Sequence, residues 1–192
     1  KVDKHGYVWI GTMRGYIQRL HPETGVFDTI LYRPGEFFVR DMYYDNDRHL
    51  YVASKGGLII IDTETQAYNI YSETTRFKET DMLTVYKDSR DLLWIGHPHG
   101  LSVWIQKNDS VYFIDQKNGL AANLVRAITE DNNHQMWIGT GNGISRIQMT
   151  NGVYSIVNYS VSDGLICNDT NVHAILKLEN GNILIGTPKG YQ

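Results

Sequence analysis

The sequence predicts an all-β fold: a β-propeller made of four-stranded antiparallel blades of about 43 residues each. Three observations predict it, namely a tetrapeptide that recurs at a nearly constant step, a glycine at a fixed distance from each copy, and the composition. The chain of 192 residues contains 13 Tyr, 5 Phe, 4 Trp and 18 Gly. Aromatic residues suit a pleated surface and glycine suits tight turns, so this composition favours short strands joined by turns.

The recurring tetrapeptide reads WIGT in its clearest form, with degenerate copies YVAS, WIGH and LIGT. Its first residues lie 42, 43, 43 and 47 positions apart, and they are Trp9, Tyr51, Trp94, Trp137 and Leu184. Four short strands fit into each step, which is the pattern of a propeller blade, whereas solenoid repeats of this length are helical. The aromatic residue that opens most copies is interpreted as core, packed between neighbouring sheets.

Three further positions keep the same frame. Six residues before the tetrapeptide stands an aspartate in four copies: Asp3, Asp45, Asp88 and Asp131. Three residues before it stands the position expected to form a tight hairpin with positive φ: Gly6, Arg48, Asp91, His134 and Gly181. Arg48 is a poor choice there, because arginine rarely adopts positive φ. Six residues after it there is always glycine, which indicates a backbone position that excludes Cβ: Gly15, Gly57, Gly100, Gly143 and Gly190.

These positions divide residues 1–192 into blades of one propeller segment. The ranges are 7–32 (strands B to D, with strand A before residue 1), 37–71, 82–115, 124–159 and a partial blade over 172–192. In the fourth copy we expect strands at 124–129, 135–140, 144–148 and 153–159, with the last turn at residues 150–152. Because closed propellers have 4–8 blades, we expect a partial ring of about four blades, completed by further blades of the same chain to about seven. If the chain closed as a four-bladed ring, the strand at 182–187 would be left over and belong to none of the four blades.

Charge and cysteine content exclude several classes of function. Lys plus Arg number 18 and Asp plus Glu 21, a net charge of −3, so we expect no nucleic-acid binding by this segment. No apolar stretch approaches a membrane span, and we expect no membrane contact by this segment. The start of the chain lacks the features of a signal peptide, so the segment is expected to come from within a longer protein. The single cysteine, Cys167, cannot form an internal disulfide or a cysteine-based zinc cluster.

Catalytic chemistry finds little support. Nucleophile and phosphate-loop motifs are missing, so we expect no enzyme activity, catalytic residue, metal or cofactor in this segment. His97 and His99 depart from the repeat and could serve a metal, but an exposed turn is the favoured interpretation. Glu130 and Asp131 belong to a pair at the recurring hairpin, which favours hydrogen bonding within the turn over acid–base catalysis.

The first positions of strand A supply the ligand-binding candidates. The residue after the first apolar position is Arg40, Leu83, Arg126 and His173 in successive blades. If this position faces the central funnel, the candidate ligand-binding set is Arg40, Arg126, His173, Asn123 and Asn171. Arginine suits carboxylate or sulfate groups of acidic sugars; the alternative is pairing with neighbouring acids. The one longer step places its extra residues in 160–170, as a functional loop or as a neutral insertion.

The residues 125–144, 82–101 and 172–191 share the pattern V-x-x-I-x-x-D-x-x-G-x-L-W-I-G-T-x-x-G-L. This pattern, with the joints at 118–123 and 162–165, resembles the two-component regulator propeller repeat. The resemblance implies the periplasmic sensor region of a hybrid two-component system histidine kinase of gut bacteria, the extracytoplasmic part of an inner-membrane receptor. It further implies an oligosaccharide ligand derived from a glycan, a homodimer through the full receptor, and a kinase outside this segment.

Two other functions remain open from the residues. A propeller enzyme of the lyase or lactonase type would need clustered histidines and acids, of which only His97 and His99 give a hint. A protein-interaction scaffold would need an exposed aromatic patch, for which Trp104, Tyr43 and Tyr44 are candidates.

The partial ring leads to a first prediction. Residues 1–192 expressed alone should not behave as a stable monomer, because a broken ring leaves sheet edges and an apolar blade face uncovered. Sedimentation and a thermal melt measure this directly. A monodisperse monomer with a cooperative melt would show that the blade boundaries are wrong.

Overall fold

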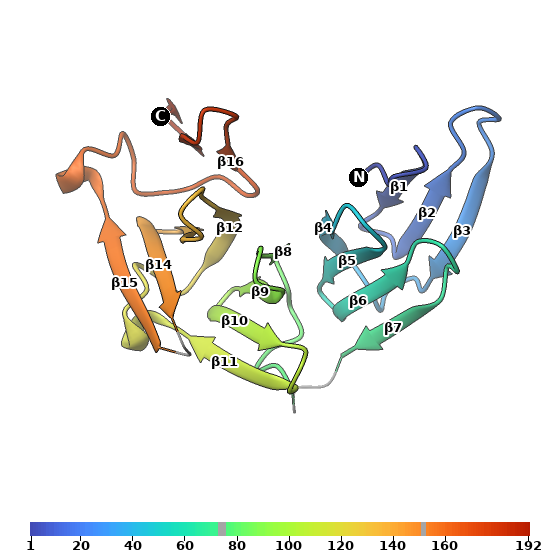
Figure 1. The fold of residues 1–192 in the computed structure, drawn as a ribbon, viewed down its shortest axis with the longest axis horizontal. Helices are drawn as coiled ribbons and strands as arrows, with labels where there is room; N and C mark the ends of the chain where they lie inside the picture. Colours follow the sequence, from blue (N-terminus) through green and yellow to red (C-terminus); the bar gives the residue numbers. More distant parts are fainter. Residues whose placement is uncertain (73–75, 151–152) are drawn as a thin grey trace. The chain divides into compact units, whose positions relative to one another are not determined.

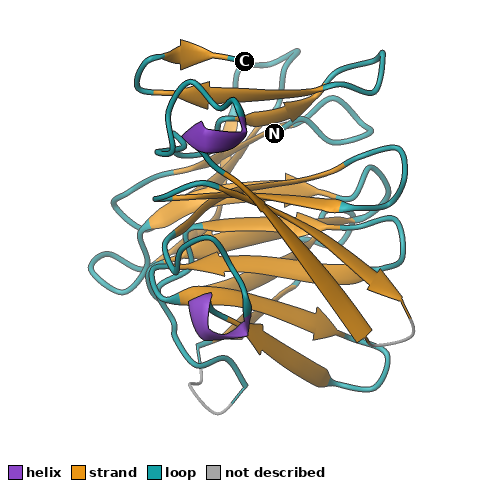
Figure 2. Cartoon of the chain, turned by 90° about the vertical axis from the view of Figure 1, so that its left-hand side faces the viewer, coloured by secondary structure: helices purple, strands orange, loops and turns teal. Residues whose placement is uncertain are grey.

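The computed structural model describes residues 1–72, 76–150 and 153–192. It confirms the all-β prediction: antiparallel sheets of three or four strands account for nearly all regular structure (Figures 1 and 2). The helices of the described residues are two short 3₁₀ turns, Gln116–Asn118 and Val161–Asp163. The chain forms two compact units, residues 1–87 and residues 88–192, and each is described by itself.

The first unit holds two complete sheets and one further strand. Its strands are β1 (Val8–Gly11), β2 (Tyr16–Leu20), β3 (Phe27–Tyr32), β4 (Val39–Tyr44), β5 (His49–Ser54), β6 (Gly57–Asp62), β7 (Tyr68–Tyr71) and β8 (Thr84–Lys87). The orders are β1-β2-β3 and β4-β5-β6-β7, and β8 packs against β4 and β5. Ahead of β1, Val2 forms an isolated antiparallel bridge with Val8, so part of a strand A precedes the first sheet.

The strands of the second unit are β9 (Leu92–His97), β10 (Gly100–Ile105), β11 (Ser110–Ile114), β12 (Val125–Glu130), β13 (Met136–Thr140), β14 (Ile144–Thr150), β15 (Val153–Tyr159), β16 (Ile175–Lys177), β17 (Ile183–Thr187) and β18 (Gly190–Tyr191). This unit holds the sheets β12-β13-β14-β15 and β16-β17-β18, and the strands β9 to β11, which pair in the order β11-β10-β9. The second strand of each repeat begins one or two residues before its tetrapeptide, and in the fourth copy it is β13, close to the predicted 135–140. Residues 151 and 152 of the predicted turn lie outside the described part. Assignment of all 192 residues to one propeller segment stays a prediction.

The recurring aspartates brace the hairpin between the first two strands of a repeat. In Asp3, Asp88 and Asp131, Oδ1 accepts the backbone amides two and four residues on, at 2.8–3.1 Å. Oδ2 accepts the indole Nε1 of the tryptophan six residues on, at 2.7 Å from Trp9, 3.0 Å from Trp94 and 2.8 Å from Trp137. This carboxylate serves the turn, as the recurrence predicted.

The second copy replaces the indole, yet its carboxylate stays ionised. Burial disfavours the charged form of Asp45, but hydrogen bonds from the amides of His49, Arg48 and Asp47 hold its pKa below the ordinary value. Lys87 Nζ lies 3.6 Å from Asp45 Oδ2 and adds an attractive charge. The brace therefore survives where tyrosine takes the place of tryptophan.

The predicted turn residues adopt the left-handed backbone that their types permit. Positive φ occurs at Gly6, Asp91, His134 and Gly181, whereas in the second copy it moves from Arg48 to Asn46, at 61°. This shift follows from chemistry, because asparagine tolerates positive φ and arginine does not. All five repeat glycines have positive φ, and at Gly143 (99°) a Cβ would lie 2.7 Å from the carbonyl oxygen of Tyr159.

The aromatic residues of the tetrapeptide lie in the core. Trp9, Tyr51 and Trp94 are at most 2% exposed, so the core interpretation is confirmed for them, while Trp137 is half-buried. In the first unit a single apolar cluster joins both sheets; its buried members are Trp9, Ile17, Leu31, Phe37, Val39, Tyr44, Leu50, Val52, Ile59 and Ile61.

The brace gives a second prediction. Asp88→Ala should destabilise the protein by about 3 kcal/mol, because it leaves two amides and a buried indole nitrogen without an acceptor. Asp88 is 4% exposed, whereas the side chain of the control Asp47 is 83% exposed. Denaturant unfolding and amide hydrogen exchange at residues 90–94 measure the loss. Equal stability of Asp88→Ala and Asp47→Ala would contradict the bracing role.

A surface ion pair in the first unit joins two successive repeats. Glu64 Oε1 lies 2.9 Å from Lys4 Nζ and 2.9 Å from His5 Nε2. The hydrogen bond from Lys4, and then that from His5, lower the pKa of Glu64 to about 2. Folding therefore favours the ionised carboxylate.

The sign of this shift gives a third prediction. Because the folded pKa lies below the ordinary 4.5, the stabilising contribution is complete above pH 4.5 and is lost as the pH falls to about 2. The melting temperature of Glu64→Gln should lie below that of the unmodified protein at pH 6, and the gap should close near pH 2. Glu36→Gln, which removes a partner of Arg33 in the same turn, is the control. A gap that persists at pH 2 would contradict the assignment.

Candidate functional site

Two of the predicted ligand-binding arginines occupy the same irregular position at the beginning of a first strand. The register shifts between Val39 and Asp41 in β4, and between Val125 and Ala127 in β12, so Arg40 and Arg126 are the extra residues of two β-bulges. A bulge re-aims the side chain of its extra residue. The equivalence inferred from the sequence therefore corresponds to a shared backbone feature.

Arg40 contacts the joint that leads into the following repeat. Its Nη2 lies 3.1 Å from Oδ1 of Asp81, and both side chains are about one-third exposed. The next residue also faces that repeat: Oδ2 of Asp41 accepts the hydroxyl of Thr84 at 2.8 Å and the amide of Val85 at 3.2 Å. Arg40 and Asp41 together attach β4 to the segment that begins β8.

Arg126 makes the equivalent attachment in the second unit. Its Nη1 pairs with Asp169 and donates to the carbonyl oxygen of Thr170 at 2.9 Å. The amide of His173 donates to the carbonyl oxygen of Arg126 at 3.1 Å. The structure thus brings Arg126 and His173 together, and it supports the alternative interpretation in which each arginine pairs with a neighbouring acid.

The two predicted asparagines have different surroundings. Asn171 is exposed and lies beside Thr170, and His173 is exposed with φ of 55°. Asn123 instead closes the joint before β12, because its Oδ1 accepts the amide of Gln116 at 2.8 Å. The structural counterpart of Asn123 is Asn168, whose Oδ1 accepts the amide of Val161 at 2.7 Å.

Asn168 is a residue that the sequence reasoning missed in this role. Both joints consist of a 3₁₀ turn with a capping box and a left-handed glycine, Gly119 or Gly164. The signal was present in the shared spacing, because Asn lies four residues after each of these glycines. Residues 160–168 match the capped joint of 115–123 position for position, so the longer step is not an insertion in that joint. The expectation for 160–170 is corrected: the extra residues lie before Ser160 and after Asn168.

Ion pairing decides what these arginines offer to a ligand. A carboxylate beside each guanidinium cancels the local positive charge, so attraction of anions is weaker than the sequence suggested. Among the described residues, Nε and Nη2 of Arg126 have no hydrogen-bond partner, and its side chain is 24% exposed. Donors next to carboxylate acceptors form a surface that matches hydroxyl groups, which both donate and accept.

The histidines of the 97–99 turn differ from expectation. His97 was expected in an exposed turn and is fully buried, with Nε2 2.8 Å from Oγ of Ser102 on the paired strand β10. His99 is exposed. The described residues contain no group of three or more His, Cys, Asp or Glu side chains that could hold a metal ion.

The acidic pair at the next hairpin serves hydrogen bonding. Glu130 accepts the amide of Ser89 at 2.9 Å and its hydroxyl at 2.6 Å, while Asp131 braces its own turn. In the part of the chain that is described, no helix has the length and apolar character to cross a membrane.

Comparison with known proteins identifies the repeat. Residues 119–142, which include β12, its hairpin and β13, match the family described as "Two component regulator propeller". Residues 119–142 therefore carry one repeat of this type. The aspartate, tryptophan and glycine positions of the same frame recur along the rest of the sequence.

Relatives extend the similarity over the whole segment. A curated protein, histidine kinase P4 of Formosa agariphila, is 24% identical over 98% of this chain and 14% of its own length. Among solved structures, the extracellular domain of a putative hybrid two component system of B. thetaiotaomicron aligns with TM-score 0.62 and 19% identity, over 100% of this chain and 32% of the other. Virginiamycin B lyase of Staphylococcus aureus aligns with TM-score 0.74 and 14% identity, over 96% and 61%. These structures support the fold, and the chain spans only a small part of the kinase.

Proposed function

We propose that this chain is part of the extracytoplasmic ligand-sensing propeller of a hybrid two-component receptor. The observation that carries the proposal is the family match at 119–142, within an alignment to a histidine kinase that covers 98% of the chain. The ligand is proposed to be an oligosaccharide released from a glycan, and the signal passes to a kinase outside this segment. The proposed location is the periplasm, and the proposed assembly is a homodimer of the full receptor.

The contacts at the first strands of the repeats suit such a role. Arg126, His173 and Asn171 lie together at the joint between two repeats, where Arg126 already bonds the backbone of Thr170. A ligand that bound there would contact both repeats at once. Its binding free energy would then depend on how those repeats are placed, which is the coupling that a sensor requires.

A lyase is the second candidate, favoured by the similarity to virginiamycin B lyase. At 14% identity this likeness extends to the fold alone. The histidine that could have supported lyase chemistry, His97, is buried and bonded to Ser102. A receptor therefore accounts better for the residues at hand.

The receptor proposal gives a fourth prediction. In the intact receptor, Arg126→Ala should weaken oligosaccharide binding by about 1.5–3 kcal/mol, the range for hydrogen bonds to a charged group. Isothermal titration calorimetry with oligosaccharides from acidic and neutral glycans measures the affinity. Stronger binding of the neutral oligosaccharides would agree with the cancelled charge at Arg126.

Arg33→Ala is the matched control, because Arg33 forms a local ion pair with Glu36 in a surface turn. Unchanged affinity in both variants would remove Arg126 from the site. Failure of the intact receptor to bind any oligosaccharide, or to alter kinase activity on binding, would overturn the sensor proposal itself.

A further inference from the structure

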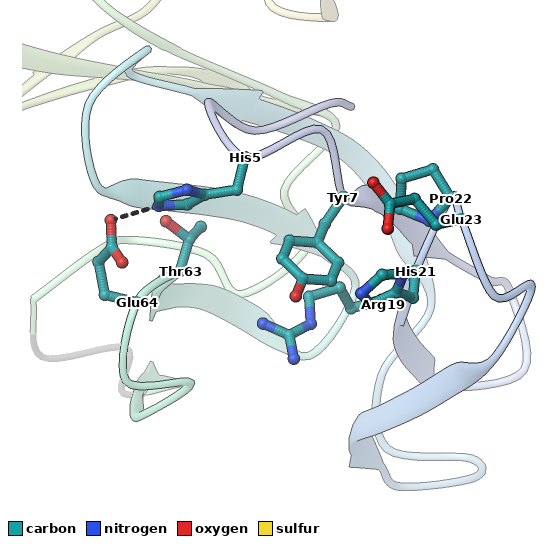
Figure 3. Close-up of a pocket in the computed structure, with 8 residues that line it drawn as sticks. All are labelled: His5, Tyr7, Arg19, His21, Pro22, Glu23, Thr63 and Glu64. Atoms are coloured by element: carbon teal, nitrogen blue, oxygen red, sulfur yellow. Dashed lines mark hydrogen bonds and ion pairs between the residues drawn. The ribbon is translucent and has the colours of Figure 1, made fainter.

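A cavity of about 390 Å³ lies in the first unit, where two successive repeats meet (Figure 3). The first repeat contributes His5 and Tyr7 ahead of β1, and the segment from Arg19 to Glu23 at the end of β2. The second repeat contributes Thr63 and Glu64, directly after β6. This volume lies at the lower end of the range for pockets that hold small molecules.

The cavity is distinct from the position of Arg40. Val39, next to Arg40, pairs with Ser54 at the end of β5, while His49 at the start of β5 pairs with Asp62 at the end of β6. Glu64 therefore lies at the edge of this sheet opposite to Arg40. The cavity is assigned from contacts within the first unit alone, and it does not depend on the proposed receptor function.

Aromatic and cationic side chains fix one wall of the cavity. The guanidinium carbon of Arg19 lies 4.2 Å from the centre of the Tyr7 ring, and the rings of Tyr7 and His21 meet edge to face at 5.0 Å. Arg19 is held from behind by Asp28, whose Oδ2 lies 2.7 Å from Nη2. The ring of Tyr7 and its hydroxyl are thereby positioned before any ligand arrives.

Several polar groups of this wall have no protein partner. Nδ1 of His21 and Nε of Arg19 are buried without a hydrogen bond. Among the described residues, the hydroxyl of Tyr7 and the carboxylate of Glu23 also have no hydrogen-bond partner. Tyr7 is half-buried and Glu23 exposed, so water can reach them. Buried polar groups are nearly always paired, so the two buried nitrogens of His21 and Arg19 beside a cavity indicate an occupant that supplies the bonds.

The charges around the cavity indicate which kind of occupant fits. Asp28 neutralises Arg19, and Glu64 neutralises Lys4. Glu64 also contacts His5, as the dashed line in Figure 3 shows. Glu23 remains as an unpaired negative charge, which disfavours anions. The phenol and the imidazole each donate and accept and the carboxylate accepts, so together they match the hydroxyl groups of a sugar, which do both.

We propose that this cavity binds a small, neutral, polyhydroxylated molecule of the size of one or two sugar rings. The Tyr7 ring and Pro22 provide the apolar contact, and Tyr7 Oη, His21 and Glu23 provide the hydrogen bonds. Because the walls come from two repeats, the bound molecule joins the turn after β2 to the turn after β6.

The test uses the intact protein with D-glucose and D-galactose as neutral probes and D-glucuronate as the anionic comparison. Hydrogen exchange with and without each sugar locates the binding, and ligand-observed NMR titration gives the dissociation constant. The neutral sugars should slow exchange at residues 5–7, 19–23 and 63–64. D-Glucuronate should bind at least fivefold more weakly.

Variants assign the effect to the cavity. Tyr7→Phe removes one hydroxyl and keeps the ring beneath Arg19, so binding of the neutral sugars should weaken about fivefold with the fold intact. Tyr68→Phe, at an exposed tyrosine on β7, is the matched control and should bind normally. Arg126→Ala should also leave this binding unchanged, which separates the cavity from the proposed receptor site.

Three outcomes would overturn the proposal. One is that none of the three sugars slows hydrogen exchange at these residues at any concentration up to the solubility of the probe. Another is that Tyr7→Phe and Tyr68→Phe bind the sugars equally well. Tighter binding of D-glucuronate than of the neutral sugars would likewise reject the neutral ligand class.

Discussion

The rest of the structure depends on one aspartate carboxylate that recurs in four of the five repeats. In its full form this carboxylate accepts two backbone amides and one indole N–H, as Asp88 does from Arg90, Leu92 and Trp94. Those donors would otherwise be buried without partners, so a single side chain determines both the hairpin and the orientation of the core tryptophan. All these bonds join residues at most six positions apart, so the local sequence determines the hairpin.

Contacts between repeats use a different kind of bond. Where Arg40 and Arg126 project from β-bulges, they reach acids in the joint that follows, Asp81 and Asp169. A third contact is made by Glu130, which accepts both the amide and the hydroxyl of Ser89. Because these partners lie 41–43 residues apart in the chain, the repeat period itself determines which side chains can meet.

The sequence was sufficient for whatever is local and periodic. Backbone chemistry alone predicts the need for glycine at Gly143, the positive φ at His134 and the absence of positive φ at Arg48. The structure confirms all three. It was not sufficient for contacts that depend on register. The bulge at Arg126 could not be seen without the β12–β13 pairing, and the burial of His97 depends on Ser102 across the sheet.

The two edges of the first unit differ in how far the protein has satisfied its own polar groups. At the edge of Arg40, guanidinium and carboxylate neutralise each other, so a ligand must compete with an existing pair. At the opposite edge, His21 and Arg19 retain buried nitrogens without partners, so a ligand would gain bonds that the protein lacks. Since an unmade buried hydrogen bond is costly and a replaced one is nearly neutral, the cavity edge is where added hydroxyl groups would contribute more binding free energy per contact.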